Sequence, residues 1–553
     1  MNIIEFIVIF SVLLFSIIGY GLFFSKYLTS HNNFTKNNIS IGYIGIFGIF
    51  FSILISYFTN LITPHNNLHN TIFLLIGIFF FIFFNLKYKK KFFLKYFIFS
   101  YLISFFSIFY FKSHDDFSYY HLSSIINITE NKLEFGIHHF DIAFNHISSI
   151  FHFHSLFKTF FTENYFYQIG PLFIVIFINT ILFENILKKK NNQSLDMSFY
   201  LNLFFLIFTN IFFYRLAEHG TDRSAQILFF LTFILSFLIL ETKKLSYDKF
   251  EIVLILFALI VSLKSFYILY SILLLVVYFK FFKLLNFSKF VKSFPVVYLF
   301  VITIFLVSLN SLAVSGCFVY PVVFTCVENF FWGYGKEKVI LAMEWYELWS
   351  KAGANPNLRV QNPTEYVDGL NWVSNWFDNY FFNKVSDFLL GILFVILIFL
   401  ISFRIKKINL RNFKNLTFIY LILILLFIEW FLNHPTLRYG GYVLIYLIFV
   451  TPVSLIISNQ NYNFKEKKKP IKIILSIVIL VFISRNVNRL ITENEIYNYN
   501  LFKNPVYNIQ DQYFTMQNRK KTHFYNTKIC DLNNSKTNLK CKKIAGFNFY
   551  FKY

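Results

Sequence analysis

The run FFLKYFIFSYLISFFSIFYF at residues 92–111 contains a single charged residue, and SHDDFSYYH at residues 113–121 follows it after one lysine. About twenty mostly apolar residues are long enough to cross the roughly 30 Å hydrocarbon core of a bilayer. Two adjacent carboxylates at the exit of such a segment are costly near hydrocarbon and tend to mark function. This junction therefore predicts a membrane fold with a candidate site in its first large loop.

The same kind of apolar run recurs along the whole chain. Hydrophobic residues make up 56% of the 553 positions, and aromatic residues make up 22%. Because the runs have the length of membrane spans, we predict an all-α polytopic membrane protein with about fourteen transmembrane helices. The expected spans are 3–24, 39–62, 70–86, 92–111, 166–187, 197–214, 224–240, 250–263, 265–282, 294–313, 386–403, 415–432, 438–458 and 470–484.

The basic residues predict the orientation of these helices. Short segments between alternate apolar runs contain about half of the 51 Lys and Arg residues, and such residues accumulate in cytoplasmic loops. The net charge of +23 then follows from topology, and no nucleic-acid partner is expected. The opposite side of the bilayer receives the loops 112–165 and 314–385.

We divide the chain into three predicted parts. Residues 1–91 form a three-helix N-terminal membrane extension, residues 92–484 form the transmembrane core with its two outer loops, and residues 485–553 form a small outer tail domain. Cysteines support this orientation, because all four lie in the expected outer segments and would pair in an oxidising compartment. Four unpaired cysteines are the alternative. These residues are Cys317, Cys326, Cys530 and Cys541.

Asp115 and Asp116 are the first catalytic candidates. A carboxylate at the membrane surface can remove a proton from an attacking hydroxyl. Adjacent helical residues point about 100° apart, so one of the two would face a substrate, and we favour Asp116 as the base. Tyr120 and His121 are expected to contact the substrate beside it. An acidic helix end that faces water is the alternative.

Residues 136–154 show helical periodicity, with an apolar stripe and a separate polar face. This pattern predicts one helix in the membrane interface, with its polar face towards a cleft. His138 and Asp141 lie one turn apart on that face and could bind a divalent cation. A solvated polar face is the alternative.

Two turns between apolar runs contain arginine. Residues 215–223 include Glu218 and Arg223, and residues 434–442 include Arg438 beside two glycines. The planar guanidinium group binds two phosphate oxygens at once, although interfacial arginines also extend to lipid headgroups. Lys264 separates two short apolar halves, which is typical either of a helix broken at a binding site or of one long kinked helix.

The loop 314–385 contains five of the six tryptophans and is too long for a plain connection. Tryptophan mixed with acidic residues is typical of surfaces that stack on sugar rings. It is equally typical of the aromatic belt at a membrane interface.

At these residues the chain resembles the GT-C superfamily of polytopic glycosyltransferases, which use polyprenyl-phosphate-linked sugars. The resemblance rests on Asp115-Asp116 followed by Tyr119-Tyr120-His121 in the first large outer loop. The 217–223 turn, the segment from Ser315 to Cys326 and the 437–441 turn look like a little-characterised bacterial GT-C-like family. Three spans precede the acidic loop here, where the superfamily usually has one, so the GT-C-like core would begin near Phe92.

The resemblance implies an inverting transfer at the periplasmic face of a bacterial inner membrane. Asp116 would deprotonate the acceptor, a glycan or lipid, while Arg438 with Arg223 or Lys264 stabilises the departing lipid phosphate. An O-antigen-type polymerase or ligase and a non-catalytic or transport protein are the alternatives.

Overall fold

The computed structural model describes residues 2–29, 39–88, 94–111, 116–162, 164–241, 247–282, 295–355, 360–405, 413–503, 505 and 539–552. Within these ranges the chain is helical apart from loops and one two-stranded sheet. Ten of the described helices are long and apolar enough to cross a membrane, and three apolar helices are shorter. An all-α polytopic membrane protein is therefore confirmed. Each of the fourteen predicted runs contains helix, but fourteen spans are not confirmed, since α4 has only 15 residues.

The elements are as follows. The N-terminal part contains α1 (Ile3–Tyr27), α2 (Ile41–Ile62), α3 (Asn67–Tyr88) and α4 (Leu94–Ile108). The first outer loop contains the π-helix η2 (Phe117–His121), α5 (Leu122–Glu130), the 3₁₀ helices η3 (Ile137–His139) and η4 (Ile142–Asn145), α6 (Ser149–Ser155) and the 3₁₀ helix η5 (Asn164–Gln168). The central bundle contains α7 (Gly170–Leu187), α8 (Met197–Ile207), the π-helix η6 (Phe208–Phe212), α9 (Leu216–Glu241), α10 (Tyr247–Leu263), the 3₁₀ helix η7 (Ser265–Ser271), α11 (Ile272–Phe282) and α13 (Pro295–Ser315).

The second outer loop contains η8 (Val323–Thr325), α14 (Lys336–Lys351), α15 (Pro363–Val367), α16 (Val373–Trp376) and the π-helix η9 (Phe377–Val385). The C-terminal part contains α17 (Ser386–Phe403), α18 (Phe413–Asn433), the 3₁₀ helix η10 (Leu437–Tyr439), α19 (Gly441–Ser458), α20 (Phe464–Tyr497), β1 (Leu539–Ile544) and β2 (Phe547–Lys552).

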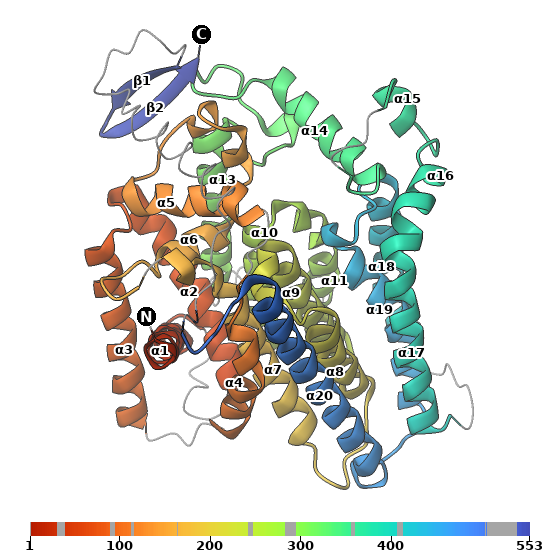
Figure 1. The fold of residues 1–553 in the computed structure, drawn as a ribbon. Coiled ribbons are helices and arrows are strands. Elements are labelled where there is room, and N and C mark those ends of the chain that lie inside the picture. The colour runs from red at the N-terminus through yellow and green to blue at the C-terminus, as the bar shows by residue number, and fades with distance from the viewer. Residues whose placement is uncertain are drawn as a thin grey trace.

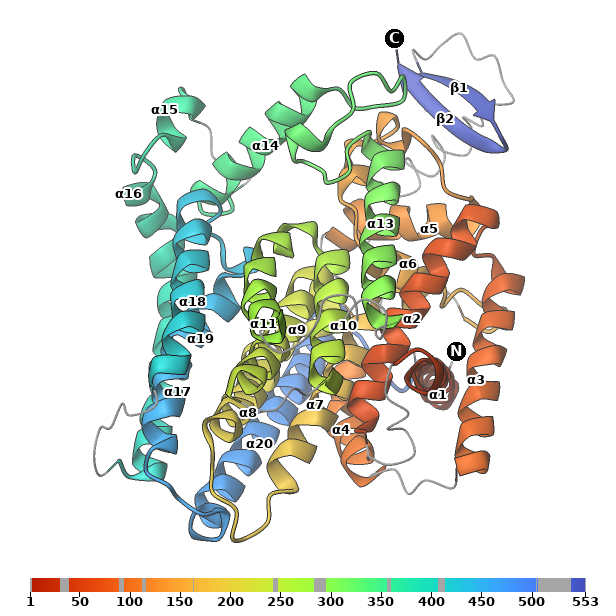
Figure 2. The same ribbon diagram turned by 180° about the vertical axis from the view of Figure 1, so that it is seen from behind.

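Helices α7 and α9 form the buried centre of the bundle, while α3, α17 and α18 expose apolar side chains on its outside (Figures 1 and 2). The N-terminal helices are packed through small residues that let backbones approach. A Cβ atom on Gly19 would lie 1.9 Å from the Gly77 carbonyl oxygen, and one on Gly42 of α2 would lie 2.4 Å from the Phe177 oxygen of α7. The N-terminal helices thus pack directly on the core, and a separate domain ending at residue 91 stays a prediction.

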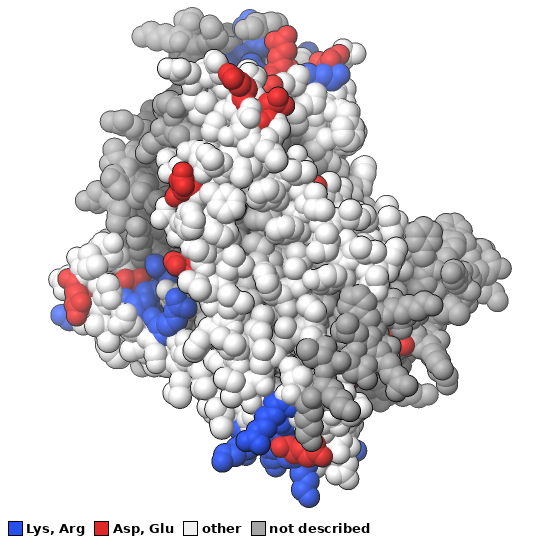
Figure 3. All heavy atoms as spheres, turned by 90° about the vertical axis from the view of Figure 1, so that its right-hand side faces the viewer, with Lys and Arg blue, Asp and Glu red and all other residues white. Residues whose placement is uncertain are grey.

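Both outer loops and the C-terminal strands lie at one end of the bundle, which is the top of Figure 1. In Figure 3, which shows one face, Lys and Arg dominate the bottom end, acidic and basic side chains share the top, and the region between is largely uncharged apart from a cluster at the left edge. This distribution is that of a multi-pass protein in a lipid bilayer.

The segment 136–154 corrects one prediction, because it forms three short helices, η3, η4 and α6, in place of one interfacial helix. Two polar side chains of this segment bond the backbone. Asp141 Oδ1 accepts from the Ala143 amide at 2.9 Å, and Ser148 Oγ accepts from the Ile150 amide. Such local bonds begin new helices and end the preceding one.

Helix α20 corrects a second prediction, because it has 34 residues in place of the expected 470–484. Two arginines that were predicted to follow the span lie inside the helix. Arg489 pairs with Glu493 at 3.1 Å and donates to the carbonyls of Phe106 and Phe109 at the end of α4. These partners compensate the charge of the Arg489 guanidinium group, so the helix continues past it.

The cysteines behave as predicted where they are described. Cys317 and Cys326 form a disulfide bond with an S–S distance of 2.07 Å. Cys541 in β1 is also disulfide-bonded, and Cys530 lies outside the described residues.

The tail contributes a β-hairpin that docks on the first outer loop. The Phe135 amide donates to the Asn548 carbonyl at 2.9 Å, and the Tyr550 amide donates to the Phe135 carbonyl at 2.8 Å. The buried carboxylate of Glu134 accepts from Tyr550 Oη at 2.9 Å and from Asn548 Nδ2 at 3.0 Å. The hairpin therefore covers a buried carboxyl group.

Docking of this hairpin is expected to weaken as pH rises. Burial raises the pKa of Glu134 from 4.5 to about 7, although the bonds from Asn548 and Tyr550 lower it. A raised pKa means that the stability is fully present below pH 4.5 and is lost as pH rises towards 7, a difference of about 3 kcal/mol. Hydrogen exchange of the Tyr550 amide should be faster at pH 8 than at pH 5 after correction for intrinsic exchange. Glu134→Gln should remove this difference, and an unchanged pH profile in that variant would contradict the assignment.

Candidate functional site

Arg438 lies in the turn between α18 and α19, at the outer end of the bundle. The backbone turns sharply there because Gly440 has a φ of +99°, and a Cβ atom on it would lie 2.0 Å from Tyr270 Oη. Gln226 on α9 holds the turn, since its Nε2 donates to the Arg438 carbonyl at 3.1 Å and its Oε1 accepts from the Val443 amide at 3.1 Å. The position of Arg438 is thus determined by backbone contacts that are independent of its own side chain.

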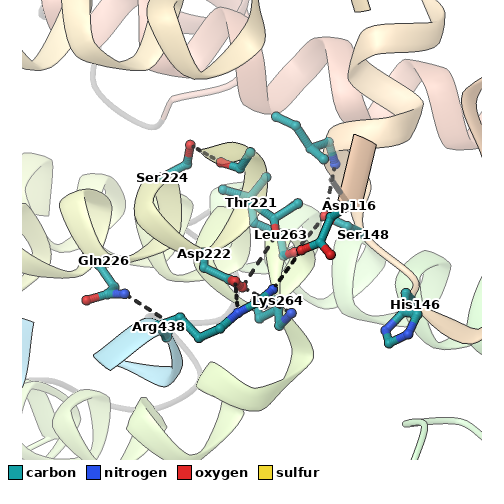
Figure 4. Close-up of polar contacts among 12 residues, drawn as sticks. Asp116, His146, Ser148, Thr221, Asp222, Ser224, Gln226, Leu263, Lys264 and Arg438 are labelled. Atoms are coloured by element: carbon teal, nitrogen blue, oxygen red, sulfur yellow. Dashed lines mark hydrogen bonds and ion pairs between the residues drawn. The ribbon is translucent and has the colours of Figure 1, made fainter. Parts of the chain in front are cut away.

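The guanidinium group of Arg438 bridges two carboxylates from distant parts of the chain. Its Nε donates to Asp222 Oδ2 at 2.9 Å, and its Nη2 donates to Asp116 Oδ2 at 3.1 Å. Figure 4 shows Asp222 between Arg438 and a second cation, Lys264, whose Nζ lies 3.0 Å from Asp222 Oδ1. The four residues form what we call the charged cluster.

Asp222 enters the cluster because α9 changes direction just before it. Gly220 has φ 55° and ψ −124°, which separates the first turn of α9 from its membrane-spanning part. A Cβ atom on Gly220 would lie 2.8 Å from the imidazole of His121. His121 therefore packs against the kink and occupies the space that a side chain would need.

Lys264 lies at a break between two helices, which is one of the two alternatives that its position between two short apolar runs left open. Its backbone is extended, with φ −152° and ψ 110°, between α10 and η7. The first outer loop fixes this break, since Ser148 Oγ donates to the Leu263 carbonyl at 2.6 Å and Ser149 Oγ donates to Ser262 Oγ at 2.7 Å. The lysine side chain is directed to Asp222 as a result.

Burial differs across the charged cluster. The side chain of Asp222 is 9% exposed, whereas those of Asp116, Lys264 and Arg438 are 25%, 22% and 33% exposed. Two positive and two negative charges balance formally, so the deep carboxylate can hold both cations in place. Asp116 is the carboxylate that a ligand can reach.

Aromatic rings surround the cations. The guanidinium carbon of Arg438 lies 5.7 Å from the ring centre of Trp349 and 5.8 Å from that of Tyr439, and Lys264 Nζ lies 5.7 Å from the Tyr439 ring. Such distances allow cation–π attraction. The site therefore presents positive charge among apolar rings, where electrostatic interactions are stronger than in water.

His146 and Tyr120 form the wall on the side of the first outer loop. Their rings lie 4.6 Å apart. Burial, and to a lesser degree the charge of Lys264, lower the pKa of His146 from 6.5 to about 4. The imidazole is consequently neutral at pH 7 and adds no third positive charge.

The structure brings together five predicted site residues and separates several others. Asp116, Tyr120, His121, Lys264 and Arg438 lie at or beside the charged cluster. Arg223 packs on Phe213, with 5.1 Å between its guanidinium carbon and the ring centre. His138 donates to the Val314 carbonyl at the end of α13, and Asp141 caps η4. Asp115 and the side chain of Glu218 lie outside the described part of the chain.

Sequence reasoning did not assign Asp222, although this residue lies in the 215–223 turn beside Arg223. An acidic residue two positions after a glycine, at the start of an apolar run, was the available signal. Trp349 and His146 were not singled out either. The sequence indicated only that tryptophans gather in 314–385 and histidines in the first outer loop.

A divalent cation was considered at His138 and Asp141. Among the described residues, no group of three or more His, Cys, Asp or Glu side chains is arranged to hold a metal ion. Asp141 accepts a backbone amide bond instead.

Comparison with known protein families gives a match over most of the chain. A family model described as a domain of unknown function, DUF8201, matches residues 3–445. The matched region contains all four residues of the charged cluster and ends within α19, before α20 and the C-terminal hairpin. No curated protein and no solved structure shows a significant match.

Proposed function

We propose that this chain, which belongs to the DUF8201 family, is a membrane glycosyltransferase that moves a sugar from a polyprenyl-phosphate donor to an acceptor hydroxyl. The observation that carries the proposal is the charged cluster. It places a reachable carboxylate, Asp116, next to two cations that a deeper carboxylate, Asp222, holds in place.

The cations have donors left for a phosphate group. Arg438 uses Nε and Nη2 for its two carboxylates, so its Nη1 group can donate to a ligand. Lys264 carries three N–H donors and forms one ion pair among the described residues. Because both side chains are partly exposed, a phosphate can reach these donors without breaking the contacts to Asp222.

The chemistry then follows from the positions. Asp116 takes the proton of the acceptor hydroxyl, whose oxygen forms a bond to the anomeric carbon of the donor sugar. The bond from that carbon to the phosphate oxygen breaks, and its electron pair stays on the polyprenyl phosphate. Arg438 and Lys264 stabilise the negative charge that develops there. Attack opposite to the leaving group inverts the anomeric centre.

The location of the charged cluster suits this pair of substrates. A polyprenyl tail is soluble only in the bilayer, whereas a polar acceptor comes from water, so the reaction needs a site at the end of apolar helices. Basic residues at the opposite end of the molecule favour the outer, periplasmic side of a bacterial inner membrane for the cluster.

The test is transfer by the purified full-length chain in lipid nanodiscs. The protein is incubated with polyprenyl-phosphate donors that carry different labelled sugars, together with a mixture of glycan and lipid acceptors. We expect one donor to lose its label and release polyprenyl phosphate, at a rate that depends on protein concentration. The matched control is Arg485→Met, since Arg485 lies at the same end of the bundle but donates to the Ile211 carbonyl and packs on Tyr214. This variant should keep the activity. If none of the donors releases its lipid phosphate and none raises the Tm of the protein, the proposal is wrong.

A further inference from the structure

Helix α14 crosses the outer end of the molecule between the C-terminal hairpin and the top of α18 (Figures 1 and 2). It is rich in charge, with Lys336, Glu337, Lys338, Glu344, Glu347 and Lys351 among its 16 residues. Its two tryptophans, Trp345 and Trp349, lie one helical turn apart. Because residues at i and i+4 share a face, the two indoles lie on the same side of α14.

The two indoles form a stacked pair that reaches the surface. Their ring centres lie 6.3 Å apart with an angle of 22° between the planes. Trp345 is 53% exposed, and Trp349 is partly buried. A large aromatic side chain half exposed to water gives up hydrophobic stabilisation unless another molecule covers it.

This aromatic pair is continuous with the charged cluster. Trp349 lies against Arg438, and its ring centre is 6.0 Å from that of Tyr439. Tyr346, between the tryptophans in sequence, approaches His146 with 3.4 Å from its hydroxyl to Nε2. A molecule that stacks on Trp345 and Trp349 would therefore extend directly towards Asp116.

We propose that Trp345 and Trp349 form the subsite for a pyranose ring of the acceptor, so that the acceptor is a carbohydrate. The inference rests on the proposed function, and it adds the chemical class of the acceptor. A pyranose has an apolar face of C–H groups that covers an indole ring, while its edge carries hydroxyl groups.

A lipid surface is the competing occupant of the same rings. Leu341 is 64% exposed and lies one turn before Trp345 on α14, so the two side chains could enter a bilayer together. The charges of α14 argue against deep insertion, because Glu344 adjoins Trp345 and Glu347 follows it. The stacking of Trp345 on Trp349 also directs the pair towards Arg438.

Acceptor kinetics distinguish a pyranose ring from a lipid surface as the molecule that covers Trp345 and Trp349. We expect Trp345→Ala to raise the KM for a glycan acceptor about tenfold, with kcat and the KM for the donor unchanged. Trp345→Phe should recover part of the loss, since a smaller ring still stacks. Leu341→Ala is the matched control and should leave the acceptor KM unchanged. An unchanged acceptor KM in Trp345→Ala, or a raised donor KM, would overturn the inference while leaving the proposed function intact.

Binding without turnover gives a second readout. Soluble oligosaccharides are added to the Asp116→Asn protein in nanodiscs without donor, and tryptophan fluorescence is compared between that protein and its Trp345→Phe derivative. A saturable change that is lost in the derivative supports the subsite, even if no transfer is ever detected. A change that appears only when detergent-solubilised protein meets phospholipid vesicles, and none with sugars, assigns the rings to the membrane and overturns the inference.

Discussion

Asp116→Asn is expected to lower the rate of sugar transfer by about 10²- to 10⁴-fold, the usual contribution of a positioned general base. The amide has nearly the same shape as the carboxylate and can still accept from Arg438 through its oxygen, but it cannot take a proton. The substitution also leaves Arg438 paired with Asp222. We therefore expect the catalytic constant to fall while donor binding is retained.

The variant should insert and fold normally. Arg438 stays paired with Asp222 and can still donate to the amide oxygen, so we expect a smaller loss of stability than for Arg438→Met. Asp387→Asn is the matched control, because Asp387 is an exposed carboxylate in the first turn of α17, at the outer end of another helix. Full transfer by Asp116→Asn at normal abundance would show that another group removes the proton.

The helical membrane fold was predictable because each membrane helix corresponds to an apolar run of suitable length in the sequence. Each apolar run contains helix, and the break at Lys264 is one of the two alternatives that the two short runs left open. The errors arose where a polar side chain found a partner that composition does not reveal. Asp141 bonds a nearby amide, and Arg489 bonds Glu493 and the end of α4.

The site was predictable only in part, because its members meet through packing. Asp116 and Arg438 were each visible as a charge at a membrane exit, but 322 positions separate them. Their contact depends on the kink at Gly220 and on the turn that Gln226 holds. Residue type indicated which charged side chains were candidates. Tertiary structure placed Lys264, and not Arg223, beside Arg438, and it added Asp222 as the carboxylate that both cations contact.

Replacement of Arg438 should have the largest combined effect on stability and activity. Arg438→Met leaves the buried Asp222 with Lys264 alone and removes one of the two proposed phosphate contacts. We expect a loss of about 2 kcal/mol of stability, less than for a fully buried pair since Arg438 is one third exposed. Thermal unfolding in nanodiscs measures this loss. Arg438→Lys keeps the charge but lacks the planar fork, so it should recover only part of the stability and little of the activity.

A second substitution distinguishes a structural arginine from a catalytic one. Asp222→Leu combined with Arg438→Met removes the more deeply buried of the two carboxylates that Arg438 contacts. We therefore expect the double variant to be more stable than Arg438→Met alone, with strongly non-additive effects. Transfer should nevertheless stay abolished, because Lys264 then has neither its anchor nor a second cation to share the phosphate. If the double variant regains both stability and transfer, Arg438 only holds the helices together, and the phosphate must bind elsewhere.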